Sequence, residues 1–244
     1  MFKTIDYLKE NRVGTIYLNR PSVHNAYNTT MRDELSEIIY VTQTDPEIAA
    51  IVIAGRGPDF CSGADLTEFG SAPSVTAARQ ARWERDLWGQ LLNVQKPVLA
   101  AIQGHCIGLG IEMAMLCDLR IASEKAKFSM PEVGLGLIPA AGGTQTLPKS
   151  LRFSDSLQML LTGQVMNAKD ALCKGMINRV VCHNQLYQET MKLAQYLVRV
   201  DSTLFSMLKK GLWDGISLSL DQAMDLETRM VLKLVSNKSH HNQG

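Results

Sequence analysis

Apolar residues in the first half of the chain follow patterns typical of β-strands. Residues 13–19 (VGTIYLN) alternate in the period of a strand. Residues 48–55 and 97–104 are largely apolar runs that end in glycine, and residues 119–123 form a shorter run of the same kind. Continuous apolar runs indicate strands that are buried on both faces of a sheet.

Helical patterns separate these strands. Thr29 or Thr30 is a candidate N-cap for a helix over residues 31–43, whose apolar residues recur at helical spacing. Residues 74–94 predict a second helix, which is rich in charge. Because strands joined through helices require crossover connections, we predict an α/β fold with a largely parallel sheet packed by helices.

The pattern becomes mainly helical after about Leu151. One short strand is predicted at residues 176–181, and the polar residues 236–244 are expected to be frayed. The clearest helical segments are residues 157–161, 168–173, 187–200 and 218–235.

Composition excludes several functional classes. The 244 residues include 25 Lys and Arg against 24 Asp and Glu, so we expect no broad basic face for nucleic acid. The five cysteines form no CxxC pair, which argues against a disulfide framework and against a zinc site. The N-terminal residues do not resemble a signal peptide, and no run approaches the ~18 apolar residues of a membrane helix. We expect a cytoplasmic protein with no metal and no membrane partner.

Glu112 lies in an apolar segment, GHCIGLGIEMAM. A helix that begins near Leu109 would place Glu112 about one turn in, with Gly108 and Leu116 at the positions where a helical ion-pair partner would stand. A buried carboxylate needs hydrogen bonds or a shifted pKa. Two interpretations stay open, an acid favoured by the helix dipole and a catalytic carboxylate.

Glu132 is the second candidate, in SMPEVGLGLIPAAGGTQ. Pro131 suits the first position of a short helix, which would place Glu132 in its first turn. The glycines that follow indicate tight turns and close packing. An acid that stabilises a helix start and a functional carboxylate both fit this pattern.

Two loops follow neighbouring predicted strands. We call residues 60–66 (FCSGADL) the Ala64 loop and residues 104–110 (GHCIGLG) the Leu109 loop. Ligands of open α/β sheets lie beyond the carboxyl ends of strands, so two such loops could hold one oxyanion between two backbone amides. Ordinary strand-to-helix turns are the alternative, and neither loop matches a phosphate-binding loop. His105 and Cys106 are chain neighbours, so we interpret both as structural rather than as a nucleophile–base pair.

Several long motifs, taken together, resemble one family. They are NRPSVHNAYN, GPDFCSGADL, KPVLAAIQGHCIGLGIEMAMLCD, MPEVGLGLIPAAGGTQTLP and LTGQVMNAKDALCKGMINRVV. In this order, from about Ile5 to about Val200, they resemble the enoyl-CoA hydratase/isomerase (crotonase) superfamily. The resemblance implies a crotonase-like spiral of ββα units over residues 1–200. It also implies a C-terminal helical region at residues 201–244, ending in a polar tail, that forms a homotrimer or a dimer of trimers.

The resemblance also implies a substrate and a mechanism. The substrate is an acyl-CoA thioester, and no separate cofactor is expected because coenzyme A is part of the substrate. The amides of Ala64 and Leu109 would hold the thioester oxygen, while Glu112 activates water for attack at C3 and Glu132 exchanges a proton at C2. Further substrate-binding positions carried over from the motifs are Asp65, Leu66, Gly108 and Gly110. A chain that keeps both glutamates is expected to be an enoyl-CoA hydratase, which adds water syn across the C2=C3 bond of a trans-2-enoyl-CoA.

This sequence departs from the family pattern at three places. Leu109 stands where the family usually has glycine, and Thr146 replaces an arginine. A phenylalanine- and lysine-rich C-terminal segment is also expected in the family but does not follow here. These departures motivate two alternatives. One is an enoyl-CoA delta isomerase that uses Glu132 as proton shuttle, and the other is a non-catalytic binding module with a crotonase fold.

Overall fold

The computed structural model describes residues 2–68, 74, 76 and 86–241. Residues 75 and 77–85 of the helix predicted over residues 74–94 lie outside these ranges, and residues 87–92 within them are helical. The chain divides into two compact units, Met1–Val198 and Arg199–Gly244, and each is described by itself.

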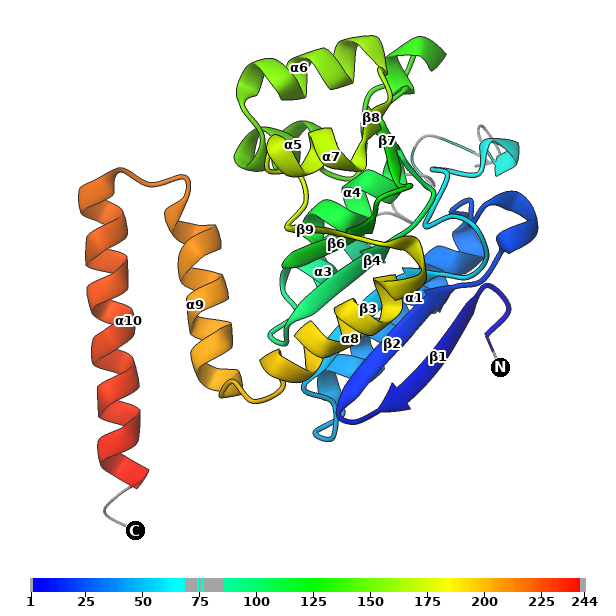
Figure 1. Ribbon diagram of the computed structural model, residues 1–244. Coiled ribbons are helices and arrows are strands. Elements are labelled where there is room, and N and C mark those ends of the chain that lie inside the picture. Colours follow the sequence, from blue (N-terminus) through cyan, green and yellow to red (C-terminus); the bar gives the residue numbers. More distant parts are fainter. Residues whose placement is uncertain (1, 69–73, 75, 77–85, 242–244) are drawn as a thin grey trace. The chain divides into compact units, whose positions relative to one another are not determined.

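The first unit is built on a sheet that is mainly parallel (Figure 1). In the described part of the chain it has six strands in the order β1-β2-β3-β4-β6-β9. The strands are β1 (Ile5–Glu10), β2 (Val13–Leu18), β3 (Ala50–Gly55), β4 (Val98–Ile102), β6 (Leu119–Ser123) and β9 (Arg179–Val181). β1 pairs antiparallel with β2 and the other neighbours pair in parallel, so the predicted parallel sheet is confirmed and β1 extends it.

A smaller sheet contains β5 (His105–Ile107), β7 (Lys127–Ser129) and β8 (Met166–Asn167). Two successive segments of the first unit have the same order of elements. β4 enters the large sheet, β5 enters the small sheet, and helix α4 (Leu109–Leu116) follows. β6, β7 and helix α5 (Gly143–Ser150) repeat that order. These are the ββα units that the family resemblance implies.

Strands β3, β4 and β6 of the large sheet are covered on both faces, as their apolar runs predict. In β3, Ile51 and Ile53 belong to one hydrophobic cluster and Val52 and Ala54 to another. Strand side chains alternate between faces, so the two clusters are the two sides of the sheet.

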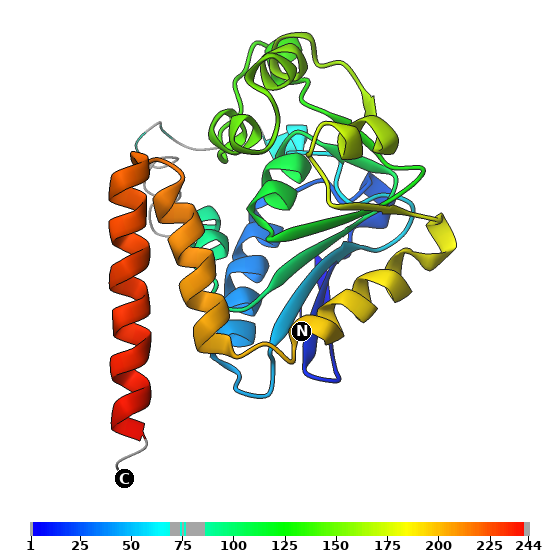
Figure 2. The ribbon, with the colours of Figure 1, turned by 60° about the vertical axis from the view of Figure 1, so that its left-hand side comes forward.

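Figure 2 shows the sheet between helices of the two sides. Helix α8 (Leu186–Leu197) packs on β3 and β4 from one side. Helices α1 (Thr29–Thr44), α3 (Leu87–Leu92) and α4 contribute side chains to the cluster on the other side. This unit also contains helices α6 (Phe153–Thr162) and α7 (Ala168–Cys173), and α7 has the bounds that the sequence predicts.

The N-cap predicted for α1 is wrong. The cap is Asn28, whose side chain accepts a hydrogen bond of 2.9 Å from the backbone N–H of Met31. Thr29 is already the first helical residue. Asn and Thr both cap helices, so composition alone does not separate adjacent candidates.

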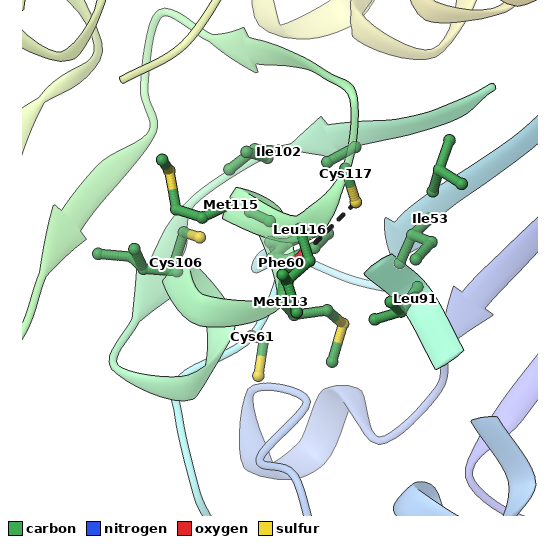
Figure 3. Packing of buried hydrophobic residues seen from close by; sticks show 14 of the residues in the cluster. Ile53, Phe60, Cys61, Leu91, Ile102, Cys106, Met113, Met115, Leu116 and Cys117 are labelled. Atoms are coloured by element: carbon green, nitrogen blue, oxygen red, sulfur yellow. Dashed lines mark hydrogen bonds between the residues drawn. The ribbon is translucent and has the colours of Figure 1, made fainter. Parts of the chain in front are cut away.

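Helix α4 is buried almost all around. Figure 3 shows Met113, Met115 and Leu116 of this helix close to Phe60 and Ile102. A helix this short is stable because neighbouring elements bury it, not because of its own propensity. The apolar surroundings of Glu112 are therefore the core of the first unit.

The second unit consists of helices α9 (Ser202–Gly215) and α10 (Leu220–His241), which pack on each other. A side chain at Gly211 would meet Met230, because a Cβ there would lie 2.7 Å from its Cε. α10 continues to His241 and so includes residues 236–241 of the polar segment. That this segment is frayed stays a prediction. Across the described ranges, no helix has the length and apolar character needed to cross a membrane.

Candidate active site

Glu112 lies in the first turn of α4 and is only 2% exposed. Its Oε1 accepts hydrogen bonds from the backbone N–H groups of Ala141 (2.7 Å) and Gly143 (2.8 Å). A Cβ on Gly143 would lie 3.1 Å from the same oxygen, so glycine permits the close approach. The loop that precedes α5 thus supplies the hydrogen bonds that a buried carboxylate requires.

Sequence reasoning did not identify these two donors. Backbone amides leave no trace in residue type, and the loop is 29 residues from Glu112 at its nearer donor. Its signal is the pair Gly142–Gly143, which suggests a backbone that approaches another group closely. Thr146 closes this turn, because its hydroxyl donates to the carbonyl of Gly142 at 3.0 Å.

Glu132 begins a short 3-10 helix, Glu132–Leu135, with Pro131 as its N-cap. Its Oε2 is buried and has no hydrogen-bond partner among the residues that the structure describes. Burial is the main cause that raises the pKa of Glu132. A hydrogen bond from its own backbone opposes the rise, and the nearby charge of Glu112 adds to it. The two glutamates are therefore close enough to interact electrostatically.

Gly108 brings the two glutamates together. It precedes α4, with φ 50° and ψ −116°, a conformation that only glycine adopts readily. A Cβ at this position would lie 2.4 Å from Glu132 Oε1. The start of the helix that carries Glu112 therefore packs directly against Glu132.

The Ala64 loop and the Leu109 loop lie side by side. Cys61 and Cys106 form a parallel bridge, and the Ile107 N–H donates to the Cys61 carbonyl at 2.9 Å. Gly110 allows this approach, because a Cβ there would lie 2.6 Å from the same carbonyl oxygen. The loops meet because β3 and β4, which precede them, are paired parallel strands.

The backbone N–H groups of Ala64 and Leu109 do not donate to the Tyr27 segment or within helix α4. Tyr27 donates to the Gly63 carbonyl and accepts from the Asp65 N–H, both at 2.8 Å. Since backbone groups alternate along an extended segment, the Ala64 N–H points away from Tyr27. Leu109 is the first residue of α4, where an N–H has no acceptor within the helix. Both amides can therefore donate to a ligand.

Leu109 fits its position without backbone strain. It is the first residue of α4 and is not among the described residues with positive φ, a conformation that Gly108 takes instead. Its half-buried side chain packs against the hydrophobic core. Replacement of the family glycine therefore leaves the helix start intact.

The side chains of Asp65 and Leu66 differ in their surroundings. Asp65 accepts from the Thr67 hydroxyl at 2.7 Å and from Arg20 Nη1 at 2.9 Å, and these two groups lower its pKa. This carboxylate therefore orders the Ala64 loop. Leu66, at the start of the 3-10 helix Leu66–Glu68, is 58% exposed. Contact of either residue with substrate stays a prediction.

Cys106 and His105 do not face each other as a catalytic pair. His105 Nδ1 donates to Asp59 at 2.7 Å, while Cys106 is buried in the core. Burial raises the pKa of the Cys61 thiol to about 11 and that of Cys106 well above its usual value. Within the described ranges, no three His, Cys, Asp or Glu side chains gather as metal ligands would.

Comparison with known proteins identifies the family. The enoyl-CoA hydratase/isomerase family model matches residues 8–244. The chain belongs to the enoyl-CoA hydratase/isomerase family. A probable enoyl-CoA hydratase of Mycobacterium tuberculosis is 34% identical over 232 residues, which cover 94% of this chain and 88% of that protein. The crotonyl-CoA hydratase of Syntrophomonas wolfei is 33% identical over 93% of this chain and 87% of its own length.

Solved structures confirm the crotonase fold. The enoyl-CoA hydratase subunit I of Geobacillus kaustophilus superposes with a TM-score of 0.90 at 34% identity, over 96% of this chain and 91% of that chain. The enoyl-CoA hydratase of Bacillus anthracis gives a TM-score of 0.89 at 26% identity, over 96% and 92% of the two chains.

The raised pKa of Glu132 predicts a stability effect that depends on pH. Below the ordinary carboxyl pKa of 4.5, Glu132 is protonated in both the folded and the unfolded state, so it lowers the free energy of unfolding little. As pH rises through the raised folded-state pKa, the native state must bury a charge that the unfolded state solvates. Glu132→Gln should therefore melt at a higher temperature than the wild type at about pH 7, with the difference fading toward about pH 4. Calorimetry across this range measures the effect.

Glu37→Gln is the matched control, because Glu37 is exposed on α1. It should change the melting temperature equally little at all these pH values. A wild type more stable than Glu132→Gln at neutral pH would contradict the assignment of Glu132 as a buried, costly carboxylate.

Gly108→Ala should destabilise the fold by about 1–3 kcal/mol, because the residue would keep a glycine-only conformation and press on Glu132. Gly134→Ala is the control, since a Cβ there meets nothing within 4 Å. Urea unfolding of the two variants measures the difference. Equal stability of both variants would show that the contact between Gly108 and Glu132 is not tight.

Proposed function

We propose that this chain is an enoyl-CoA hydratase, which adds water syn across the C2=C3 bond of a trans-2-enoyl-CoA to give a 3-hydroxyacyl-CoA. Relatives that carry the name enoyl-CoA hydratase match most of the chain. The observation that supports it best is a buried carboxylate, Glu112, next to a second carboxylate, Glu132, whose inner oxygen has no protein partner in the described residues.

The two loops suit a thioester carbonyl. When water attacks C3, negative charge develops on the thioester oxygen as an enolate forms. The amides of Ala64 and Leu109 would stabilise this charge, and one such donor contributes about 3–4 kcal/mol in comparable oxyanion holes. Their value comes from being fixed in place before the reaction, which the pairing of the Ala64 loop with the Leu109 loop provides.

Glu112 is the proposed base. Two N–H donors hold Oε1 in place, and water would be activated by the same carboxylate. Because the hydrogen bonds hold the carboxylate in place, it can orient one water molecule toward C3.

Glu132 is the proposed proton donor at C2. Its raised pKa increases the share of the protonated form, which is the form that donates. Glu112 takes one proton from water as the water oxygen bonds to C3, and the displaced double-bond electrons form the new C2–H bond with the proton of Glu132. A proton then passes from Glu112 to Glu132, which restores both groups. Water is the sole co-reactant in this balance, so the proposal includes no separate cofactor.

Both carboxylates are expected to be essential. Glu112→Gln and Glu132→Gln should each lower hydration by at least about 10²-fold, because each amide keeps the shape but loses the proton-transfer group. Loss of the conjugated thioester absorbance of a 2-enoyl-CoA measures the rate. Glu37→Gln, an exposed acid on α1, should retain the wild-type rate.

The outcome also separates the alternatives. Near-normal hydration by either glutamine variant would remove that residue from the mechanism. An isomerase would instead convert a 3-enoyl-CoA to the conjugated isomer and would depend on Glu132 alone, whose raised pKa and unpartnered oxygen suit a proton shuttle. A wild type that binds no acyl-CoA and converts no enoyl-CoA would favour the non-catalytic alternative.

We also propose that the second unit mediates assembly into a homotrimer or a dimer of trimers. Its helices expose large apolar side chains, and exposed apolar patches commonly mark association surfaces. They include Leu208, Leu212, Leu220, Met224 and Leu232.

Light scattering should give about three or six times the chain mass of 27.0 kDa. Leu212→Glu should reduce this mass, because Leu212 is 74% exposed and would carry a charge into a subunit contact. Tyr40→Glu is the control, since Tyr40 is similarly exposed on α1 of the first unit. A wild type that is monomeric at assay concentrations would contradict this proposal.

A further inference from the structure

Asp59 is a buried carboxylate that the proposed chemistry does not use. It lies between β3 and the Ala64 loop, with its side chain 5% exposed. We propose that Asp59 is a positioning residue that fixes the Ala64 loop against the Leu109 loop, so that the amides of Ala64 and Leu109 can act on one oxygen. This inference rests on the proposed hydratase function.

Three contacts surround the Asp59 carboxylate. Oδ1 accepts hydrogen bonds of 2.7 Å from both the backbone N–H and the ring Nδ1 of His105. Oδ2 accepts from the ring Nδ1 of His24 at 2.6 Å. One buried carboxylate thus connects three separate segments of the chain. Asp59 directly precedes the Ala64 loop, His105 belongs to the Leu109 loop, and His24 belongs to a third segment.

Backbone hydrogen bonds join the same three segments next to Asp59. Cys61 N–H donates to the His105 carbonyl at 3.0 Å, on the side of the Leu109 loop. Ser62 N–H donates to the His24 carbonyl at 3.0 Å, on the opposite side. Ala64 comes five residues after Asp59, and Leu109 four residues after His105. A displacement at Asp59 would therefore shift both amides.

The backbone around Asp59 is strained in a way that these contacts offset. His24 and Asn25 have positive φ angles of 53° and 55°, which non-glycine residues adopt only with support. Asn25 Nδ2 donates to the Asp59 carbonyl at 2.8 Å, in addition to the bond from the His24 ring to the carboxylate. Position 104 must be glycine for the chain to pass this close to the carboxylate, because a Cβ there would lie 2.3 Å from Asp59 Oδ1.

The contacts keep Asp59 ionised. Burial by itself would raise its pKa, but the hydrogen bonds from the His105 backbone and from both histidine rings lower the pKa below its ordinary value. Hydrogen bonds to an ionised acceptor are shorter and stronger than neutral ones. A charged carboxylate is therefore better suited than a neutral amide to hold the two loops in register.

Asp59→Asn tests this role because it keeps the shape and removes the charge. We expect kcat for hydration to fall about 10- to 100-fold while KM changes less than about threefold, since misaligned amides lose contacts made mainly in the transition state. A second readout is the absorbance of bound p-dimethylaminocinnamoyl-CoA, a chromophoric enoyl thioester that absorbs at longer wavelength when its carbonyl is polarised. The shift on binding should be smaller in Asp59→Asn than in the wild type.

Asp155→Asn is the matched control. Asp155 of α6 is also a buried carboxylate. It forms ion pairs with Arg152, the N-cap of α6, and with Lys174, the C-cap of α7. Its substitution should lower the melting temperature yet leave kcat and the absorbance shift at wild-type values. Comparison of the two variants separates loss of oxyanion geometry from general loss of stability.

A second variant decides the question should Asp59→Asn fail to fold. His24→Gly removes the contact to Oδ2, glycine adopts the positive φ of this position readily, and the His24 ring is 61% exposed, so folding is expected to tolerate the change. It should give a reduced absorbance shift and a reduced kcat. The positioning role would be overturned if kcat and the absorbance shift of Asp59→Asn both had wild-type values. Where Asp59→Asn does not fold, wild-type values of both in His24→Gly would overturn it. A wild type that neither hydrates enoyl-CoA nor shifts the chromophore would instead overturn the proposed function itself.

Discussion

Two backbone N–H groups, from Ala141 and Gly143, make it possible to bury a carboxylate inside the apolar helix α4. Each of them offsets part of the cost of burying Glu112, because a buried acceptor that lacks hydrogen bonds is destabilising. The donors come from a loop far along the chain, so the helix and the loop before α5 must fold together. Packing of α4 and placement of a reactive carboxylate are therefore one structural requirement.

The two glutamates are made different by their surroundings. Glu112 is held by hydrogen bonds that suit an acceptor, whereas Glu132 has a buried oxygen that no described residue contacts by a hydrogen bond, and a raised pKa. Two carboxylates in unlike environments are suited to opposite halves of a proton-transfer reaction. The close approach of Gly108 to Glu132 brings the second carboxylate to the start of the helix that carries the first.

Long apolar runs made the central strands predictable, because strands buried on both faces have few alternatives. Glu112 and Glu132 were identifiable as acids in unusual contexts, and the family motifs suggested their roles. The contacts that hold these two glutamates could not be predicted from the sequence. Ala141 and Gly143 act through backbone amides, and Asp59 meets His24 and His105 only after folding. Sequence spacing indicates which residues share an element, while such contacts depend on how distant elements meet.

Leu109 illustrates how a motif position can change while the backbone conformation around it is kept. What the backbone requires at the start of α4 is one residue with positive φ in contact with Glu132, and Gly108 fulfils this requirement. A second close approach, to the Cys61 carbonyl, falls on Gly110. Leu109 lies between these glycines with an N–H that has no intrahelical acceptor and a side chain packed on the core. An oxyanion donor is a backbone group, so its side chain is constrained by packing and not by the hydrogen bond that the amide makes.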